Sequence, residues 1–319
     1  GITLFFISIF ILKIDSIHIE MNDLDLINRI INPDLPKGKV FYDPSFHYNY
    51  ILAFLSDFFS MDPRSPNFAR IIWFIEQALA TFVLVKLCNL ISKNDKICLI
   101  IFVFLYLIFK SGETDQKTMI TFIYFFSIYY FLQQKWIKSA LFVGLTFYIH
   151  IGMALWWFLP SVFALAIVFF AHKKISKLKI LFIYIFVTTA LSFPILYFYV
   201  LELNNQNLIT SDFFTRHIYG TGNSILYYFT TQKGWANFDY HLIEFFMSIV
   251  VFIIGYKKWK EYNPEVDYIK YIAFGVFILF VINFFLVDVI HHGTTMRLQL
   301  LRSFQIIKLF TFFFVVFFI

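Results

Sequence analysis

The chain has 319 residues, of which 60% are hydrophobic and 14% charged, and its formal net charge is +6. Soluble domains are about half apolar and about a quarter charged, so this composition excludes an ordinary soluble enzyme or binding module. The hydrophobic residues recur in separate runs, which predicts an integral membrane protein with many spans.

The expected fold is all-α, a polytopic bundle of transmembrane helices, because a helix satisfies its own backbone hydrogen bonds in lipid. About ten apolar segments follow one another along the chain: 2–14, 68–91, 97–109, 118–132, 137–149, 153–171, 179–201, 241–256, 268–287 and 301–319. We expect 1–319 to form a single transmembrane domain that is truncated at both ends, because the chain opens on Gly1 and both ends lie in apolar runs.

Residues 137–171 fit either one long tilted helix or two short helices hinged at His150-Ile151-Gly152. Two helices are favoured, because alternate connections are then short and rich in lysine, as cytoplasmic loops are. These connections are 92–96, 133–138, 172–178 and 257–267. The opposite side would then hold the long loops 15–67 and 202–240, and we expect it to be the non-cytoplasmic face of the membrane.

The first long loop contains two candidate carboxylates. Hydrophobic residues at helical spacing after Asp23 predict an amphipathic helix in the membrane interface, with Asp23 and Asp25 on its polar side. Further on, the stretch FYDPSFHYNY (41–50) holds Asp43 extended before a proline. A plain turn explains Asp43 equally well, and an interfacial aromatic belt explains the rings around it.

Basic residues on the same side are candidates for binding phosphate. Arginine at a membrane edge is costly unless it is paired, and its guanidinium fork matches two phosphate oxygens. A structural partner such as Asp288, a lipid headgroup or simple snorkelling are the alternatives. The candidate lipid-phosphate and substrate ligands are His47, His150, Arg216, His217, Arg297 and Arg302.

Polar residues also occur inside the predicted spans. Glu76, Gln77 and Asn283 are expected to hydrogen-bond between helices, with Lys86 or water as a partner for Glu76.

Several short motifs carry a resemblance to a known family. They are Asn22-Asp23 after the first span, the stretch from Asp34-Leu35 to Tyr42-Asp43-Pro44, the turn from Gly144 to His150, and the approach from Gln299 to Arg302-Ser303. In this layout the chain resembles the C-type (GT-C) glycosyltransferase superfamily, nearest to an uncharacterised bacterial subgroup. The resemblance implies transfer of a sugar from a polyprenyl-phosphate carrier to a glycan, lipid or protein acceptor on the outer side.

The resemblance also implies roles for residues. An aspartate of the first external loop would act as base or metal ligand, which gives Asp23 as the first choice and Asp43 as the second. Better known members carry an acidic pair at the tip of the first span, whereas here Asp23 is followed by Leu24 and Asp25. A divalent metal, Mg or Mn, would be held by Asp23 and Asp25 if one binds.

Other functions compete with this interpretation. An extracytoplasmic polysaccharide polymerase or ligase would depend on the histidines and arginines and tolerate loss of Asp23 and Asp43. A transporter or flippase of lipid-linked glycans would show inverted repeats and broken helices, but Pro160 and Pro194 are isolated and no repeat is visible. A structural subunit of a larger complex is a further alternative. The positive charge fits membrane orientation, so no nucleic-acid partner is expected.

Overall fold

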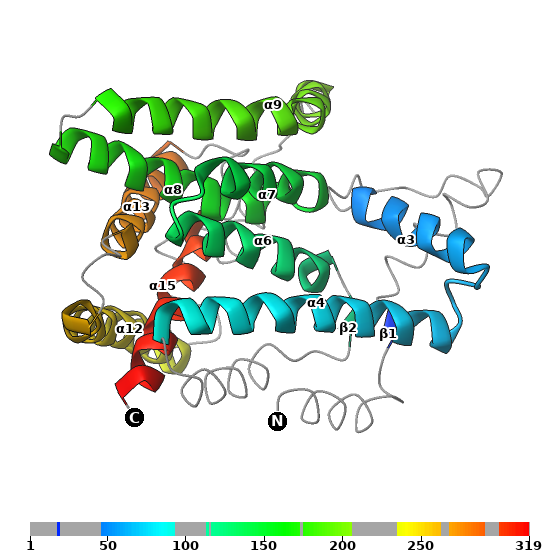
Figure 1. The fold of residues 1–319 in the computed structure, drawn as a ribbon, viewed down its shortest axis with the longest axis horizontal. Coiled ribbons are helices and arrows are strands. Elements are labelled where there is room, and N and C mark those ends of the chain that lie inside the picture. The colour runs from blue at the N-terminus through cyan, green and yellow to red at the C-terminus, as the bar shows by residue number, and fades with distance from the viewer. Residues whose placement is uncertain are drawn as a thin grey trace. The chain divides into compact units, whose positions relative to one another are not determined.

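The computed structural model describes residues 18–19, 46–92, 113–114, 116–172, 175–205, 235–262, 268–290 and 300–318. Regular structure in these ranges is helical, apart from a parallel pair of two-residue strands, β1 (His18–Ile19) and β2 (Glu113–Thr114) (Figure 1). The chain divides into two compact units. Unit 1 comprises 1–129 and 148–150, and unit 2 comprises 130–147 and 151–319.

The helices follow the apolar segments of the sequence. They are α3 (Phe46–Phe59), α4 (Pro66–Ser92), α6 (Gln116–Leu132), α7 (Trp136–Ile149), α8 (Ile151–His172), α9 (Ile175–Asn205), α12 (Trp235–Tyr262), α13 (Tyr268–Asn283), the π-helix η2 (Phe284–Val289), the 3-10 helix η3 (Leu300–Ser303) and α15 (Phe304–Phe318).

Four helical segments in the described part of the chain are long and apolar enough to cross a membrane: Pro66–Ile91, Ile151–Ala171, Ile175–Tyr197 and Tyr268–Val289. The last has 22 residues and is therefore roughly 33 Å long, close to the thickness of a bilayer's hydrocarbon core. The chain is thus a polytopic integral membrane protein. The count of about ten spans stays a prediction, since 2–14 and 97–109 lie outside the described residues.

Two local expectations have different outcomes. The chain breaks at His150, between α7 and α8, so the choice of two helices for 137–171 is confirmed. Helix α3 was not expected, because 14 residues are too few for a span and the segment was assigned to the long loop 15–67. The sequence did hold one signal for the start of this helix. Pro44 lies just ahead of it and disfavours helix in the residue before the proline.

In unit 1, α4 buries Trp73, Leu87 and also the Glu76 side chain, which is 3% exposed. The expected partnership of Glu76 with Lys86 is wrong. The Lys86 ammonium lies over the Phe82 ring instead, 4.8 Å from its centre. The reason is geometric, because ten residues of helix separate Glu76 and Lys86 by about 15 Å.

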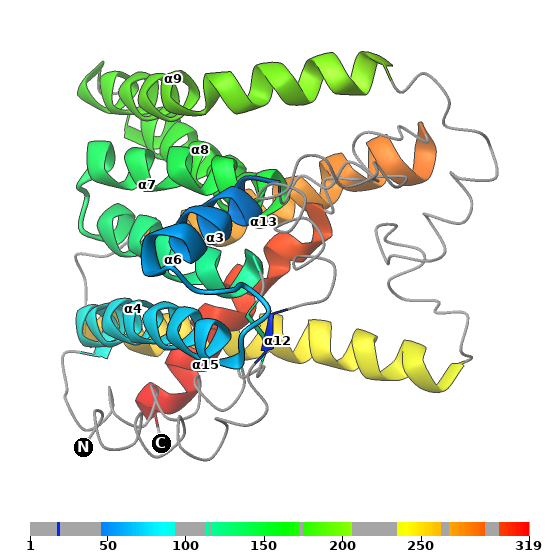
Figure 2. The same ribbon diagram turned by 90° about the vertical axis from the view of Figure 1, so that its right-hand side faces the viewer.

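Helices of unit 2 approach one another closely at small residues, as membrane helices commonly do. Helix α9 lies alongside α8 (Figures 1 and 2), and it also contacts α7, where the Thr188 hydroxyl donates to the Ala140 carbonyl at 3.3 Å. Helix α8 crosses α13 at Gly275. A Cβ on Gly275 would lie 2.6 Å from the Pro160 carbonyl oxygen, so the crossing requires glycine there.

Candidate functional site

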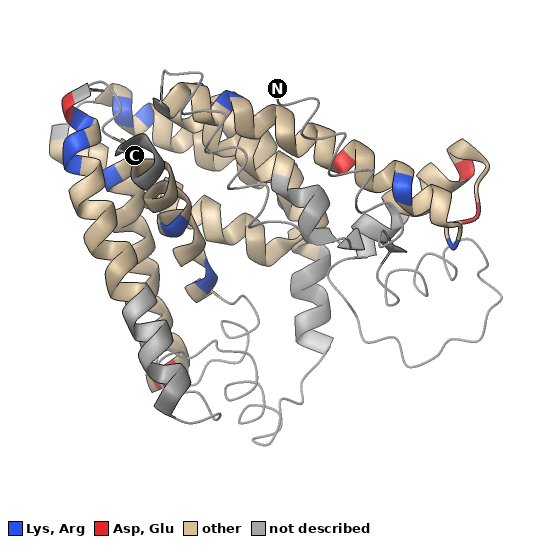
Figure 3. Ribbon diagram, turned by 90° about the horizontal axis from the view of Figure 1, so that it is seen from below, with Lys and Arg blue, Asp and Glu red and all other residues tan. Residues whose placement is uncertain are grey.

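The starts of three helices meet at one end of unit 2, which we call the lysine-rich end. The Trp136 ring at the start of α7 packs edge-on against the Tyr268 ring at the start of α13, with centroids 5.1 Å apart. The Lys177 ammonium, near the start of α9, donates to the Tyr268 hydroxyl at 3.4 Å. These helices begin within or directly after the segments 133–138, 172–178 and 257–267, and the contacts between their first turns agree with the prediction that these lysine-rich segments share one side, although 173–174 and 263–267 lie outside the described residues. Figure 3 shows basic residues grouped at this end.

A second group of polar residues lies toward the opposite end of unit 2. We call it the arginine end and define it by Trp156, Asn283, Arg302 and Ser303. The ring centroids of Phe280 and Phe304 are 5.8 Å apart, which brings the last turn of α13 against the junction of η3 and α15. Asn283 follows Phe280 by three residues, and Ser303 immediately precedes Phe304.

Arg302 is the cation of the arginine end. Its guanidinium carbon lies 5.8 Å from the centre of the Trp156 ring, which belongs to the second turn of α8. Although the residue as a whole is exposed, apolar surroundings lower the pKa of its guanidinium by desolvation. The group nevertheless keeps its proton, because an arginine is not deprotonated in proteins. No carboxylate among the described residues pairs with Arg302, so an anion bound there would be stabilised.

Two fully buried polar side chains complete the arginine end. Asn283 and Ser303 are both 0% exposed. Within the described residues the Ser303 hydroxyl has no hydrogen-bond partner, whereas Asn283 interacts with its surroundings. A buried polar atom left unsatisfied costs about 1–3 kcal/mol, so a polar ligand or water that reached it would bind favourably.

The helix geometry changes at the same place. Directly after Asn283 the chain forms the π-helix η2, and such turns occur frequently at functional sites. The arginine end therefore combines a cation, an aromatic face, a buried hydroxyl and an irregular helix. The exposed cation among them suits an anionic ligand.

The predicted site residues divide into three groups. Arg302 lies at the arginine end, and His150 is a half-buried residue at the break between α7 and α8, where it makes interactions with its surroundings. His47 belongs to α3, but its side chain is not among those described. Asp23, Asp25, Asp43, Arg216, His217 and Arg297 lie outside the described residues. Their convergence on one site stays a prediction.

A metal centre is likewise untested for the predicted ligands Asp23 and Asp25. Among the described residues, no group of three or more His, Cys, Asp or Glu side chains is placed to hold a metal ion.

Sequence reasoning did not select Trp156 or Ser303. Trp156 lies in an apolar run and is 4% exposed, so nothing in the sequence separates it from the other core aromatic residues. Ser303 was quoted only as part of the approach to the last span. Its one signal was its position directly after Arg302.

No protein-family model matches the sequence, and no curated protein or solved structure is significantly similar to it. The class that the fold defines is a helical, polytopic integral membrane protein.

Proposed function

We propose that the protein is a membrane glycosyltransferase that moves a sugar from a polyprenyl-phosphate carrier to a glycan, lipid or protein acceptor. The reaction would take place on the side of the arginine end, which would be the periplasmic or exterior face of a bacterial inner membrane. The observation that supports this is Arg302, a cation over the Trp156 ring that has no carboxylate partner among the described residues.

The chemistry is a substitution at the anomeric carbon of the donor sugar. The acceptor oxygen forms a bond to that carbon, while the bond from carbon to phosphate oxygen breaks and the carrier phosphate leaves with the electron pair. An aspartate, Asp23 or Asp43, takes the proton of the acceptor hydroxyl. A Mg or Mn ion held by Asp23 and Asp25 would add positive charge beside the phosphate.

The leaving phosphate gathers negative charge as the bond breaks, and preorganised cations stabilise it. Arg302 provides a guanidinium suited to two phosphate oxygens, and the buried Trp156 ring beneath it stabilises that guanidinium through a cation–π contact. We propose that the remaining predicted ligands contribute on the same side: His47, His150, Arg216, His217 and Arg297.

The experiment is a transfer assay in reconstituted vesicles with synthetic polyprenyl-phosphate hexoses as donors. Arg302→Gln is expected to lower turnover at least tenfold, because the leaving phosphate loses its charge partner. The matched control is Lys179→Gln, which removes one exposed charge near the start of α9 and is expected to keep normal turnover. Equal turnover in wild type and Arg302→Gln would remove the assigned role.

Variants of the aspartates separate this function from its competitors. Asp23→Asn or Asp43→Asn should abolish transfer without lowering the folded yield. If both variants keep turnover while Arg302→Gln loses it, a polymerase or ligase that depends on basic residues is the better account. Movement of the carrier across the bilayer without a new glycosidic bond would instead indicate a flippase.

A further inference from the structure

We propose that unit 2 has a second anion site, at its lysine-rich end, that binds the phosphate headgroup of an anionic phospholipid. The site lies where α7, α9 and α13 begin, and we define it by Lys135, Trp136, Lys177 and Tyr268. It is separate from the arginine end and does not depend on the glycosyltransferase proposal.

The aromatic part of the site is fixed by packing. The Tyr268 ring is 6% exposed and contacts the rings of Phe131 and Trp136, at centroid distances of 5.9 and 5.1 Å. Its hydroxyl accepts the hydrogen bond from Lys177 at 3.4 Å, which holds that ammonium beside the aromatic pair. Tryptophan and tyrosine are enriched at the level of lipid headgroups, where one side of the ring is apolar and the other polar.

Lys135 lies next to this pair on a constrained piece of backbone. Its N–H donates to the Tyr130 carbonyl at 2.9 Å, in the tight connection between α6 and α7, and its side chain is exposed. The Trp136–Tyr268 pair therefore has Lys177 of α9 bonded to its tyrosine and Lys135 directly before its tryptophan in the chain.

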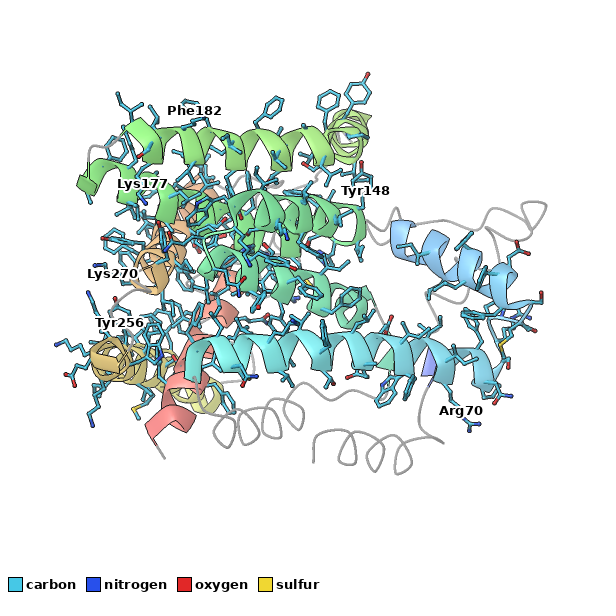
Figure 4. All side chains as sticks on the ribbon, in the orientation of Figure 1. Arg70, Tyr148, Lys177, Phe182, Tyr256 and Lys270 are labelled. Carbon is cyan, nitrogen blue, oxygen red and sulfur yellow. The ribbon has the colours of Figure 1, made fainter. Side chains whose placement is uncertain are left out.

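The lysine-rich end has an excess of positive charge. No carboxylate among the described residues pairs with Lys135, Lys138, Lys177, Lys179 or Lys257. In the described parts of 130–147, 172–180 and 256–271, Glu261 is the one acidic residue. Figure 4 shows the labelled Lys177, Lys270 and Tyr256 along the same edge of unit 2. Clusters of this kind attract anionic lipid headgroups.

Apolar surface next to the lysines favours a lipid over free phosphate. On α7, Leu141 and Leu145 follow Lys138 at helical spacing and are 42% and 43% exposed. On α9, Phe182 and Phe186 follow Lys179 in the same way, with 63% and 72% exposure, and Figure 4 shows the Phe182 side chain pointing outward. A lipid held at its headgroup would lay its acyl chains along such stripes.

The test uses the full chain in nanodiscs of phosphatidylcholine with increasing phosphatidylglycerol, and measures by native mass spectrometry the preference for phosphatidylglycerol. A lysine near a membrane surface contributes about fivefold to the binding of anionic lipid. The double variant Lys135→Gln/Lys177→Gln should therefore lower the preference about 25-fold. The matched control, Lys257→Gln/Lys258→Gln at the end of α12, removes the same charge and should lower it by no more than about fivefold.

An equal loss of lipid preference in both double variants would show a general electrostatic attraction and no defined site, and would overturn the proposal. An unchanged preference in both variants would overturn it as well. Displacement of the lipid by millimolar inorganic phosphate would assign the site to free phosphate and overturn the lipid assignment. Circular dichroism checks that the variants fold. If the double variant does not fold, the wild type still provides a test, because added salt should weaken its preference severalfold. A salt-independent preference would contradict the proposal.

Discussion

The two ends of unit 2 are built differently. Around the lysine-rich end, the Phe131 ring makes edge-on contacts with Trp136, Trp157, Tyr184 and Tyr268. One buried polar network lies beside this cluster, in which the Ser161 hydroxyl hydrogen-bonds to the Phe158 carbonyl at 2.7 Å and to the Tyr184 hydroxyl at 2.9 Å.

At the arginine end the buried Ser303 hydroxyl has no hydrogen-bond partner among the described residues, and the last turn of α13 gives way to a π-helix. Proteins break local rules of this kind mainly where they bind or react. We therefore expect the aromatic cluster around Phe131 to contribute much of the stability of unit 2, and the Ser303 hydroxyl at the arginine end to contribute little.

Removing the centre of the aromatic cluster should have the largest effect. Phe131 is fully buried, and Phe131→Ala should lower the free energy of unfolding by about 3 kcal/mol, through lost ring contacts and a cavity. Denaturant titration in detergent measures this. Phe182→Ala is the matched control, because Phe182 is 63% exposed and its loss should change stability by less than about 0.5 kcal/mol. Similar losses in both variants would contradict the assigned role of the cluster.

The crossing of α8 and α13 lies between the two ends, and a change there should have the second largest effect on stability. Gly275→Ala places a methyl group 2.6 Å from the Pro160 carbonyl oxygen and 2.9 Å from its Cα, and backbone atoms cannot move aside easily. We expect a loss of about 1–3 kcal/mol in the same titration.

Gly144→Ala is the comparison for that variant. Its new methyl group would meet the side chain of Leu191, with 2.7 Å to Cδ2, and a side chain can shift. A smaller loss is expected there, and the reverse order would show that the α8–α13 crossing is looser than described.

Two serines sharpen the contrast between the ends. Ser161→Ala breaks a buried network and leaves the Tyr184 hydroxyl without that partner, so stability should fall by about 1 kcal/mol. Ser303→Ala removes a hydroxyl that has no described partner, so stability should stay within about 0.5 kcal/mol or rise. Thermal unfolding followed by circular dichroism compares them. A larger loss for Ser303→Ala would show that Ser303 contributes to packing more than to binding.

The sequence predicted helices where an apolar run and a polar connection marked the same boundary. It predicted the break at His150 because two helices, unlike one, place the lysine-rich connections on the same side of the membrane. Helix α3 was not predicted, because its length and composition resemble those of an ordered loop. The π-helix after Asn283 was not predicted for another reason. Its turns hold about one residue more than those of an α-helix, and no periodicity in the sequence indicates this.

The candidate site was predicted in part. Arg302 was selected because a guanidinium at a membrane edge is costly in free energy unless it is paired. Trp156 and Ser303 were not, because their importance comes from burial and from neighbours distant in sequence. Those neighbours are set by tertiary packing, as in the contact of Phe280 with Phe304.

The central claim is that the lysine-rich end and the arginine end face opposite sides of a membrane, with the arginine end outside. Single cysteines test this in intact cells, in a background with Cys88 and Cys98 replaced by alanine. Ser176→Cys lies near the start of α9, and Ile290→Cys lies just after η2, where Ile290 is 62% exposed. A membrane-impermeant maleimide should label position 290 directly and position 176 only after permeabilisation. Labelling of position 176 from outside, with position 290 protected, would contradict the account.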